Sequence, residues 1–220
     1  MVRFVKGGST GLEQQKAKRY PQKRKTVEYK YPSIKEEVKK SYEDAKIVAP
    51  VHLSKNNEGE LIQIFEYIDK DDWVFCSWRN HYHALLHGIP EDKLYNDIMG
   101  GRSMSTNSKE HNFYASSIVG GIIPLAVGAA LGAKMKFSDK KVWCFIGDMT
   151  FETGIFYEAY KYVKNFDLPL QFVVGDNNLS VHTPTDIAWN RKEISVPDDV
   201  VYYKYENGYP HHGTGMWVNF

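Results

Sequence analysis

Two apolar segments that each end in Gly-Asp constrain the fold of this chain more than any other feature. The first is VWCFIGD, residues 142–148, and the second is LQFVVGD, residues 170–176. Between them, FYEAYKYVKNF at 156–166 is typical of a helix. A strand, a helix and a second strand in this order predict parallel strands joined by a crossover helix.

The rest of the chain continues this alternation. We expect further strands at 72–78 and 200–205, and helices at 33–50 (ended by Pro50), 57–70, 81–88, 90–100 and 122–136. We expect residues 100–112 to form a polar loop, and residues 1 to about 32 to be extended or disordered. The sequence therefore predicts an α/β fold with a parallel sheet flanked by helices. We place this domain at residues 41–220 and a basic N-terminal arm at residues 1–40.

Charge and cysteine content narrow the class of protein. The net charge of +1 gives no overall attraction to nucleic acid or membrane. The arm has 12 Lys or Arg residues against four Asp or Glu residues. We expect it to dock on a partner subunit, with RNA or a lipid surface as the alternative. Cys76 and Cys144 lie in apolar segments, which suits core residues in a reducing compartment. We expect a cytoplasmic protein, since MVRFVKGGSTG is not a secretory signal.

Residues 112–133 imitate a membrane span because they carry no charge. Much of this segment is Gly, Ala and Ser, so it is only weakly apolar. A Gly-Gly pair indicates a loop that enters a helix at Pro124. Gly128 and Gly132 have the spacing of closely packed helices. We therefore expect a buried helix that packs through small residues, and no membrane span.

Oxygen-bearing side chains follow both of the first two strands. Asp148 ends the first strand, and Asp176, Asn177 and Asn178 end the second. Ligands of parallel sheets bind at the carboxyl ends of strands. These oxygens therefore converge if the strands are neighbours, and Mg²⁺ prefers such ligands and bridges to phosphates. Each residue alone also suits a helix cap or a turn.

The spacing of these residues resembles a known cofactor motif. GDM, 27 residues and then NN is similar to the diphosphate-binding motif of thiamine diphosphate enzymes. Three further segments resemble, in the same order, the alpha subunits of 2-oxo acid dehydrogenases: SWRNHYHALLHGIPEDKLYNDIMGG, SMSTNSKEHNFYASSIVGGIIPLAVGAALGAK and NNLSVHTPT. The likeness runs from Trp73 to Thr185, and the motif spacing also suits transketolases. It implies a shortened thiamine diphosphate-binding fold.

The resemblance assigns roles to individual residues. It implies that Asp148, the Asn178 side chain and the Ser180 carbonyl bind Mg²⁺, and that Arg79 binds the diphosphate. His81 matches the family's histidine in its helix, and we expect a catalytic role for it. The other residues expected at the cofactor are Trp78, Ser117, Val119, Gly147, Met149 and Thr150, beside Asp148 and Asn178.

Three positions depart from the family pattern. Met149 replaces the last Gly of the GDG turn, and Ser117 replaces a Gly near the cofactor. Ser105 replaces a His that touches substrate or the active-site loop in the family. In addition, the segment between His182 and Val200 is too short for a strand and helix that relatives carry. These departures favour, as an alternative, a subunit that keeps the fold without the cofactor.

The resemblance implies an enzyme subunit that binds the magnesium-diphosphate half of thiamine diphosphate. It implies decarboxylation, or acyl or ketol transfer, on a small 2-oxo acid or ketose-type substrate. A beta-like partner is expected to carry the pyrimidine-binding domain and the activating Glu, in an α2β2 heterotetramer, so the chain is active only with this partner. The alternatives are a non-catalytic assembly subunit, a transketolase-type N-terminal half, a self-paired homodimer and a Rossmann-like module. The last lacks its G-x-G-x-x-G or Walker sequence here.

Overall fold

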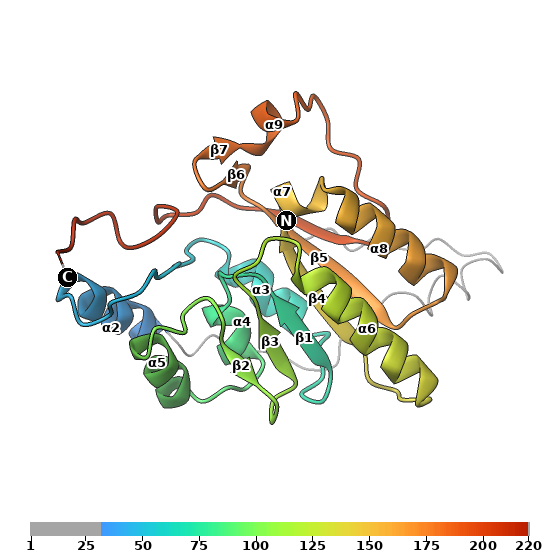
Figure 1. Cartoon of the computed structure of the whole chain (residues 1–220), viewed down its shortest axis with the longest axis horizontal. Helices are drawn as coiled ribbons and strands as arrows, with labels where there is room; N and C mark the ends of the chain where they lie inside the picture. Colours follow the sequence, from blue (N-terminus) through green and yellow to red (C-terminus); the bar gives the residue numbers. More distant parts are fainter. Residues whose placement is uncertain (1–31, 220) are drawn as a thin grey trace.

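A six-stranded sheet organises the described residues, which are 32–219 of the computed structural model (Figure 1). The expected disorder of residues 1–32 and most of the basic arm lie outside the described residues. Across the sheet the strands are β2 (Asn107–Ser108), β3 (Phe113–Ala115), β1 (Trp73–Cys76), β4 (Val142–Gly147), β5 (Leu170–Asp176) and β8 (Val201–Lys204). Every adjacent pair is parallel except β2 and β3. The α/β fold class predicted from the sequence is confirmed.

Helices cover both faces of the sheet. They are α2 (Pro32–Glu43), α3 (Glu58–Phe65), α4 (His81–Leu86), α5 (Glu91–Met99), α6 (Ile122–Met135), α7 (Asp148–Phe151), α8 (Gly154–Asn165) and α9 (Thr185–Ala188). A two-stranded hairpin, β6 (Leu179–Ser180) and β7 (Thr183–Pro184), follows β5 outside the main sheet.

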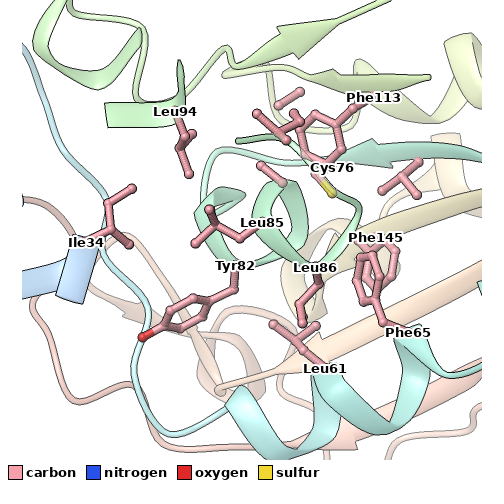
Figure 2. Close-up of a cluster of buried hydrophobic side chains, with 14 of the residues drawn as sticks. Ile34, Leu61, Phe65, Cys76, Tyr82, Leu85, Leu86, Leu94, Phe113 and Phe145 are labelled. Atoms are coloured by element: carbon pink, nitrogen blue, oxygen red, sulfur yellow. The ribbon is translucent and has the colours of Figure 1, made fainter. Parts of the chain in front are cut away.

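Successive side chains of β4 point to opposite faces of the sheet and so enter two different hydrophobic cores. Val142, Cys144 and Ile146 face one core with α6 and α8, whereas Trp143 and Phe145 face the other with α3, α4 and α5. Figure 2 shows part of this second core, where the ring of Phe65 stacks on Phe145 at 5.7 Å between centroids. A strand that is apolar on both faces is what a sheet covered on both sides requires.

Helix α2 crosses the boundary expected between residues 40 and 41. Ile34 and Val38 of this helix are buried in the second core. The helix ends at Glu43, so the expectation that it continues to Pro50 was wrong. The amide of Lys46 donates to the carbonyl of Ser41 at 2.9 Å, and Ala45 has a left-handed φ of 56°. This is a Schellman-type end, in which one left-handed residue stops the helix.

The uncharged segment 112–133 differs from expectation in two ways. Its first residues contain strand β3, which pairs with β1, where a loop was expected. Helix α6 is buried on one face only, since Pro124, Leu125 and Gly128 are exposed. The expected buried helix is therefore only half-buried within this chain. Among the described helices, none is both long and apolar enough to cross a membrane.

The two cysteines behave as expected of core residues. Cys76 and Cys144 are free, fully enclosed and lie on adjacent strands β1 and β4. Burial raises the pKa of both thiols, so they stay protonated and serve as small apolar side chains.

Candidate functional site

The strand order places a switch point between β1 and β4. From β1 the chain continues to β3 on one side, whereas β4, β5 and β8 follow on the other. In parallel sheets the crevice at the carboxyl ends of such strands is the usual ligand site. Here Trp78 and Arg79 follow β1, Asp148 follows β4, and Asn177 follows β5. The predicted convergence of two strand ends is confirmed by the register, which pairs Gly147 with Gly175.

A cavity of about 70 Å³ lies at this switch point. Seven of the expected site residues line it: Trp78, Arg79, Gly147, Asp148, Met149, Thr150 and Ser180. Tyr205 and Asn57 also line it, and the sequence reasoning missed both. Tyr205 directly follows β8, which is the neighbour of β5, so its place at a carboxyl strand end was the available signal.

Asp148 is the carboxylate at the centre of the site. It begins α7, its exposed fraction is 2%, and its Oδ2 has no hydrogen-bond partner among the described residues. Burial raises the pKa of Asp148 and the nearby carboxylate of Asp176 raises it further, whereas the Thr185 hydroxyl and Arg191 oppose this change. A buried carboxylate oxygen without a partner is costly unless a cation or donor meets it. The side chain therefore fits a metal ligand.

In contrast, both carboxylate oxygens of Asp176 already have hydrogen-bond partners within the chain. Its Oδ1 accepts from the amide of Asn178 at 2.7 Å, and its Oδ2 accepts from the hydroxyl of Tyr202. Arg191 Nη2 lies 3.8 Å from the same Oδ2, and Arg191 also pairs with Glu152 at 2.7 Å. Asp176 thus fixes the turn after β5 and connects it to the segment after α9.

The structure places Asn178 at the edge of the site. It is exposed with a left-handed φ of 52°, and its Oδ1 accepts from the amide of Asp186 at 3.2 Å. The side chain therefore caps α9 and does not line the cavity, whereas Asn177 does. A magnesium-ligand role for Asn178 requires this amide oxygen to leave the cap.

Arg79 is half-buried and faces both the cavity and the C-terminal segment. Its Nη2 donates to the carbonyl of His211 at 3.1 Å, while its buried Nε has no partner among the described residues. Burial lowers the pKa of Arg79, and the hydroxyl of Tyr205 and the carboxylate of Asp148 oppose this change. The guanidinium thus remains a cation beside Asp148 with a donor to spare.

His81, Ser117 and Val119 are not brought into the cavity. The Nε2 of His81 lies 3.0 Å from the hydroxyl of Ser103, and burial lowers the pKa of this histidine to about 4. Ser117 and Val119 are exposed in the turn before α6. Ser117 and Val119 could therefore contact a cofactor only at the exposed surface of this turn.

Met149 occupies the turn where the related motif has Gly. Its sulfur accepts a hydrogen bond from the indole Nε1 of Trp189 at 3.1 Å, so the residue after α9 covers it. The segment between β6 and Trp189 therefore lies over the turn that follows β4. Within the described part of the chain, no group of three His, Cys, Asp or Glu side chains is arranged to hold a metal ion. The expected magnesium set contains one carboxylate only.

Comparison with known proteins gives a consistent family. A family model described as "Dehydrogenase E1 component" matches residues 29–201. The chloroplastic alpha-3 subunit of the pyruvate dehydrogenase E1 component from Arabidopsis thaliana is 31% identical over 152 residues, which are 62% of this chain and 36% of that protein.

Two bacterial relatives give the same picture. The alpha subunit of acetoin:2,6-dichlorophenolindophenol oxidoreductase from Bacillus subtilis is 29% identical over 148 residues, 63% of this chain and 44% of that protein. The pyruvate dehydrogenase E1 alpha subunit of Rickettsia prowazekii is 26% identical over 181 residues, which are 70% of this chain and 56% of that protein. The matches thus span between 36% and 56% of the length of these relatives.

Proposed function

Because the chain belongs to the dehydrogenase E1 component family, we propose that it is the alpha-like subunit of a two-subunit, thiamine diphosphate-dependent enzyme. Its substrate is a 2-oxo acid or a ketose-type compound, and the reaction is decarboxylation or acyl or ketol transfer. The relatives named above are alpha subunits of pyruvate and acetoin enzymes. The observation that carries the proposal is the buried, unpartnered Oδ2 of Asp148 at the switch point beside Arg79.

The cofactor would be held by its diphosphate end. Asp148 fits a magnesium ligand, together with the Ser180 carbonyl and with Asn178 once its amide leaves the α9 cap. Arg79 supplies charge and a free Nε donor for a diphosphate oxygen. When bound, thiamine diphosphate supplies the electron sink for breaking or forming a bond beside a carbonyl. The task of this chain is to bind and orient that end of the cofactor.

We propose roles away from the cavity for His81, Ser117 and Val119. Ser117 and Val119 lie in the open turn before α6, where a ring of the cofactor would meet a second subunit. His81 holds Ser103 in the loop after α5, so we propose that it positions this loop around the reactants. A catalytic role for His81 requires this loop to move.

We propose a beta-like partner that supplies the activating Glu, in an α2β2 heterotetramer. The exposed apolar face before and along α6 supports this arrangement. Ile118 is 70% exposed and Leu125 is 46% exposed, and they accompany the exposed Gly128. Small and apolar residues on an open face suit close packing against another chain. The free, buried cysteines support a reducing location, which we propose is the cytoplasm.

A non-catalytic assembly subunit is the second candidate. Met149 fills the turn beside Asp148, and the amide of Asn178 is engaged in the α9 cap. Both features would weaken cofactor binding if they persist in the assembled protein. This candidate predicts a stable complex with the partner that binds no thiamine diphosphate.

The test is to express the chain alone and with its beta-like genomic neighbour. Hydrogen exchange at the reactive ring carbon of thiamine diphosphate, followed by mass spectrometry, reports activation of the cofactor without knowledge of the substrate. We expect exchange with both chains present and none with either alone. Full exchange by this chain alone would contradict the two-subunit proposal, and a complex that neither binds nor activates the cofactor would leave the assembly subunit as the function.

A further inference from the structure

The C-terminal segment folds back onto the site. The amide of Gly213 donates to the carbonyl of Val51 at 2.7 Å, and the carbonyl of His211 accepts from His52 Nδ1 at 2.7 Å. The same carbonyl accepts from Arg79 Nη2 at 3.1 Å. In Figure 1 the segment after β8 crosses the molecule and ends beside α2. The segment is therefore attached to the cavity at Arg79.

This fold-back gathers a histidine cluster, which we define as His52, His182, His211 and His212. The ring centroids of His52 and His211 are 4.8 Å apart, and those of His182 and His212 are each 6.0 Å from that of His211. The indole of Trp78, a cavity residue, lies 6.2 Å from the His211 ring.

Packing does not explain the cluster. His52 is buried, but His182 and His212 are exposed, so the cluster opens to solvent. A transition-metal site is also not supported, since residues 32–219 contain no group of three His, Cys, Asp or Glu side chains arranged to hold a metal ion. The cluster therefore lies partly open to solvent, beside the cavity residues Trp78 and Arg79.

The side chains that face His211 within the cluster are basic ones. Burial lowers the pKa of His211, and Arg79, His212 and His182 lower it further; no described carboxylate is among these neighbours. Burial likewise lowers the pKa of His52 to about 4; the hydrogen bond to the His211 carbonyl opposes this, whereas the His211 ring, Arg79 and His212 act in the same direction as burial. Asp148 is the carboxylate that acts on Arg79 itself. Arg79 therefore supplies the positive charge, and the uncharged imidazoles of His52 and His211 supply N–H donors, a combination that suits an anion.

Two buried atoms at the centre of this region have no hydrogen-bond partner in the described structure: Arg79 Nε and His211 Nδ1. The first is always a donor, and the second is a donor in one tautomer. Leaving such a buried group unpaired is costly, so both atoms fit an acceptor that is supplied from outside the chain. A planar or tetrahedral oxyanion has acceptors enough for both.

We propose that His182, His211 and His212, with Arg79 behind them, bind an oxyanion group of the reactants. This inference rests on the proposed function, because that function supplies two sources of the group. One is the carboxylate of a 2-oxo acid substrate, and the other is the diphosphate of the cofactor. On the first alternative the histidine cluster selects acidic substrates; on the second it extends the diphosphate site beyond Arg79.

The test is calorimetric titration of the full chain, assembled with its beta-like partner, with pyruvate and with inorganic phosphate, each with and without thiamine diphosphate and Mg²⁺. The variant is the double substitution His182→Asn and His212→Asn, and the control is His111→Asn. His111 bonds Ser108 beside β2, at the far edge of the sheet. We expect saturable binding of at least one anion, weakened tenfold or more in the double variant and unchanged in the control.

The two sources give different results. Pyruvate binding that persists with the cofactor present supports the substrate carboxylate, and phosphate binding that thiamine diphosphate displaces supports the diphosphate. If neither anion binds the wild type, or if the double variant binds both as the wild type does, the oxyanion site is wrong. Failure of thiamine diphosphate to bind, with anion binding intact, would overturn the proposed function alone.

Discussion

The guanidinium of Arg79 faces two different parts of the protein. One of its nitrogens donates to the backbone carbonyl of His211, and the side chain also lines the cavity that contains Asp148. A planar group with five donors can hold the C-terminal segment and a diphosphate oxygen at once. The single ammonium of lysine cannot reproduce that geometry.

We therefore expect Arg79→Lys to weaken thiamine diphosphate about tenfold, or about 1.4 kcal/mol. Unphosphorylated thiamine should bind weakly to both proteins, because it lacks the group that Arg79 meets. The measurement is calorimetry on both proteins, with Arg102→Lys as the matched control. Arg102 pairs with Asp97 at the end of α5, outside the site. Equal affinity for wild type and Arg79→Lys would show that Arg79 serves only the C-terminal segment.

Among the elements, those with a clear apolar pattern were predictable, including the four-residue strands β1 and β8, whereas β3, α7 and α9 were not. The strands β4 and β5 and the helix α8 have patterns strong enough to identify from residues alone. Strand β3 has three residues, and α7 and α9 have four each, so their existence depends on tertiary contacts.

The candidate site divides in the same way. Asp148 was predictable because it directly follows a strand, whereas Arg79, three residues after β1, was expected only from the family resemblance. The engagement of Asn178 as the cap of α9 and the contact of His211 with Arg79 were not predictable. The second of these joins residues 132 positions apart, and no local pattern reports such a contact.

One ion pair joins α8 to the loop before β8. Asp199 accepts from the Tyr160 hydroxyl at 2.6 Å and from the ammonium of Lys164. Burial raises the pKa of Asp199, but the bonds from Lys164 and Tyr160 outweigh this, so the pKa is lowered overall. A lowered folded-state pKa gives stability that is present above the unfolded pKa, about 3.9, and is lost as the pH falls through the folded value.

We expect Asp199→Asn to reduce the free energy of unfolding by about 1 kcal/mol at pH 7, since the pair is partly buried. The difference from wild type should shrink as the pH falls below about 4. Urea unfolding at several pH values measures it, with Asp139→Asn, an exposed residue before β4, as the control. A difference that is constant with pH would mean that packing, and not charge, is responsible.

In the whole molecule, the open face of α6 is the surface that we propose the second chain covers. A Cβ added at Gly128 meets nothing within 4 Å in this chain. Leucine there should leave the isolated chain folded and slightly more stable, by up to about 1 kcal/mol, because Gly is a poor helix former.

We expect Gly128→Leu to abolish assembly with the beta-like partner, since the larger side chain prevents close packing. Analytical ultracentrifugation of co-expressed chains measures this. Gly59→Leu is the matched control, because Gly59 is an exposed helical residue of α3 that also has nothing within 4 Å of an added Cβ. Normal assembly of Gly128→Leu would remove α6 from the proposed interface.

We propose that Asp148 holds the cation of a thiamine diphosphate site, and the isosteric change Asp148→Asn tests this role. Calorimetry should show that wild type, together with its partner, binds thiamine diphosphate in Mg²⁺ and not in excess chelator. Asp148→Asn should bind at least a hundredfold more weakly, and Asp139→Asn should bind as wild type does. In chelator, Asp148→Asn should melt no lower than wild type, because burial raises the pKa of Asp148 and the fold disfavours its charge. Equal affinity of wild type and Asp148→Asn, or tight binding in chelator, would contradict the account.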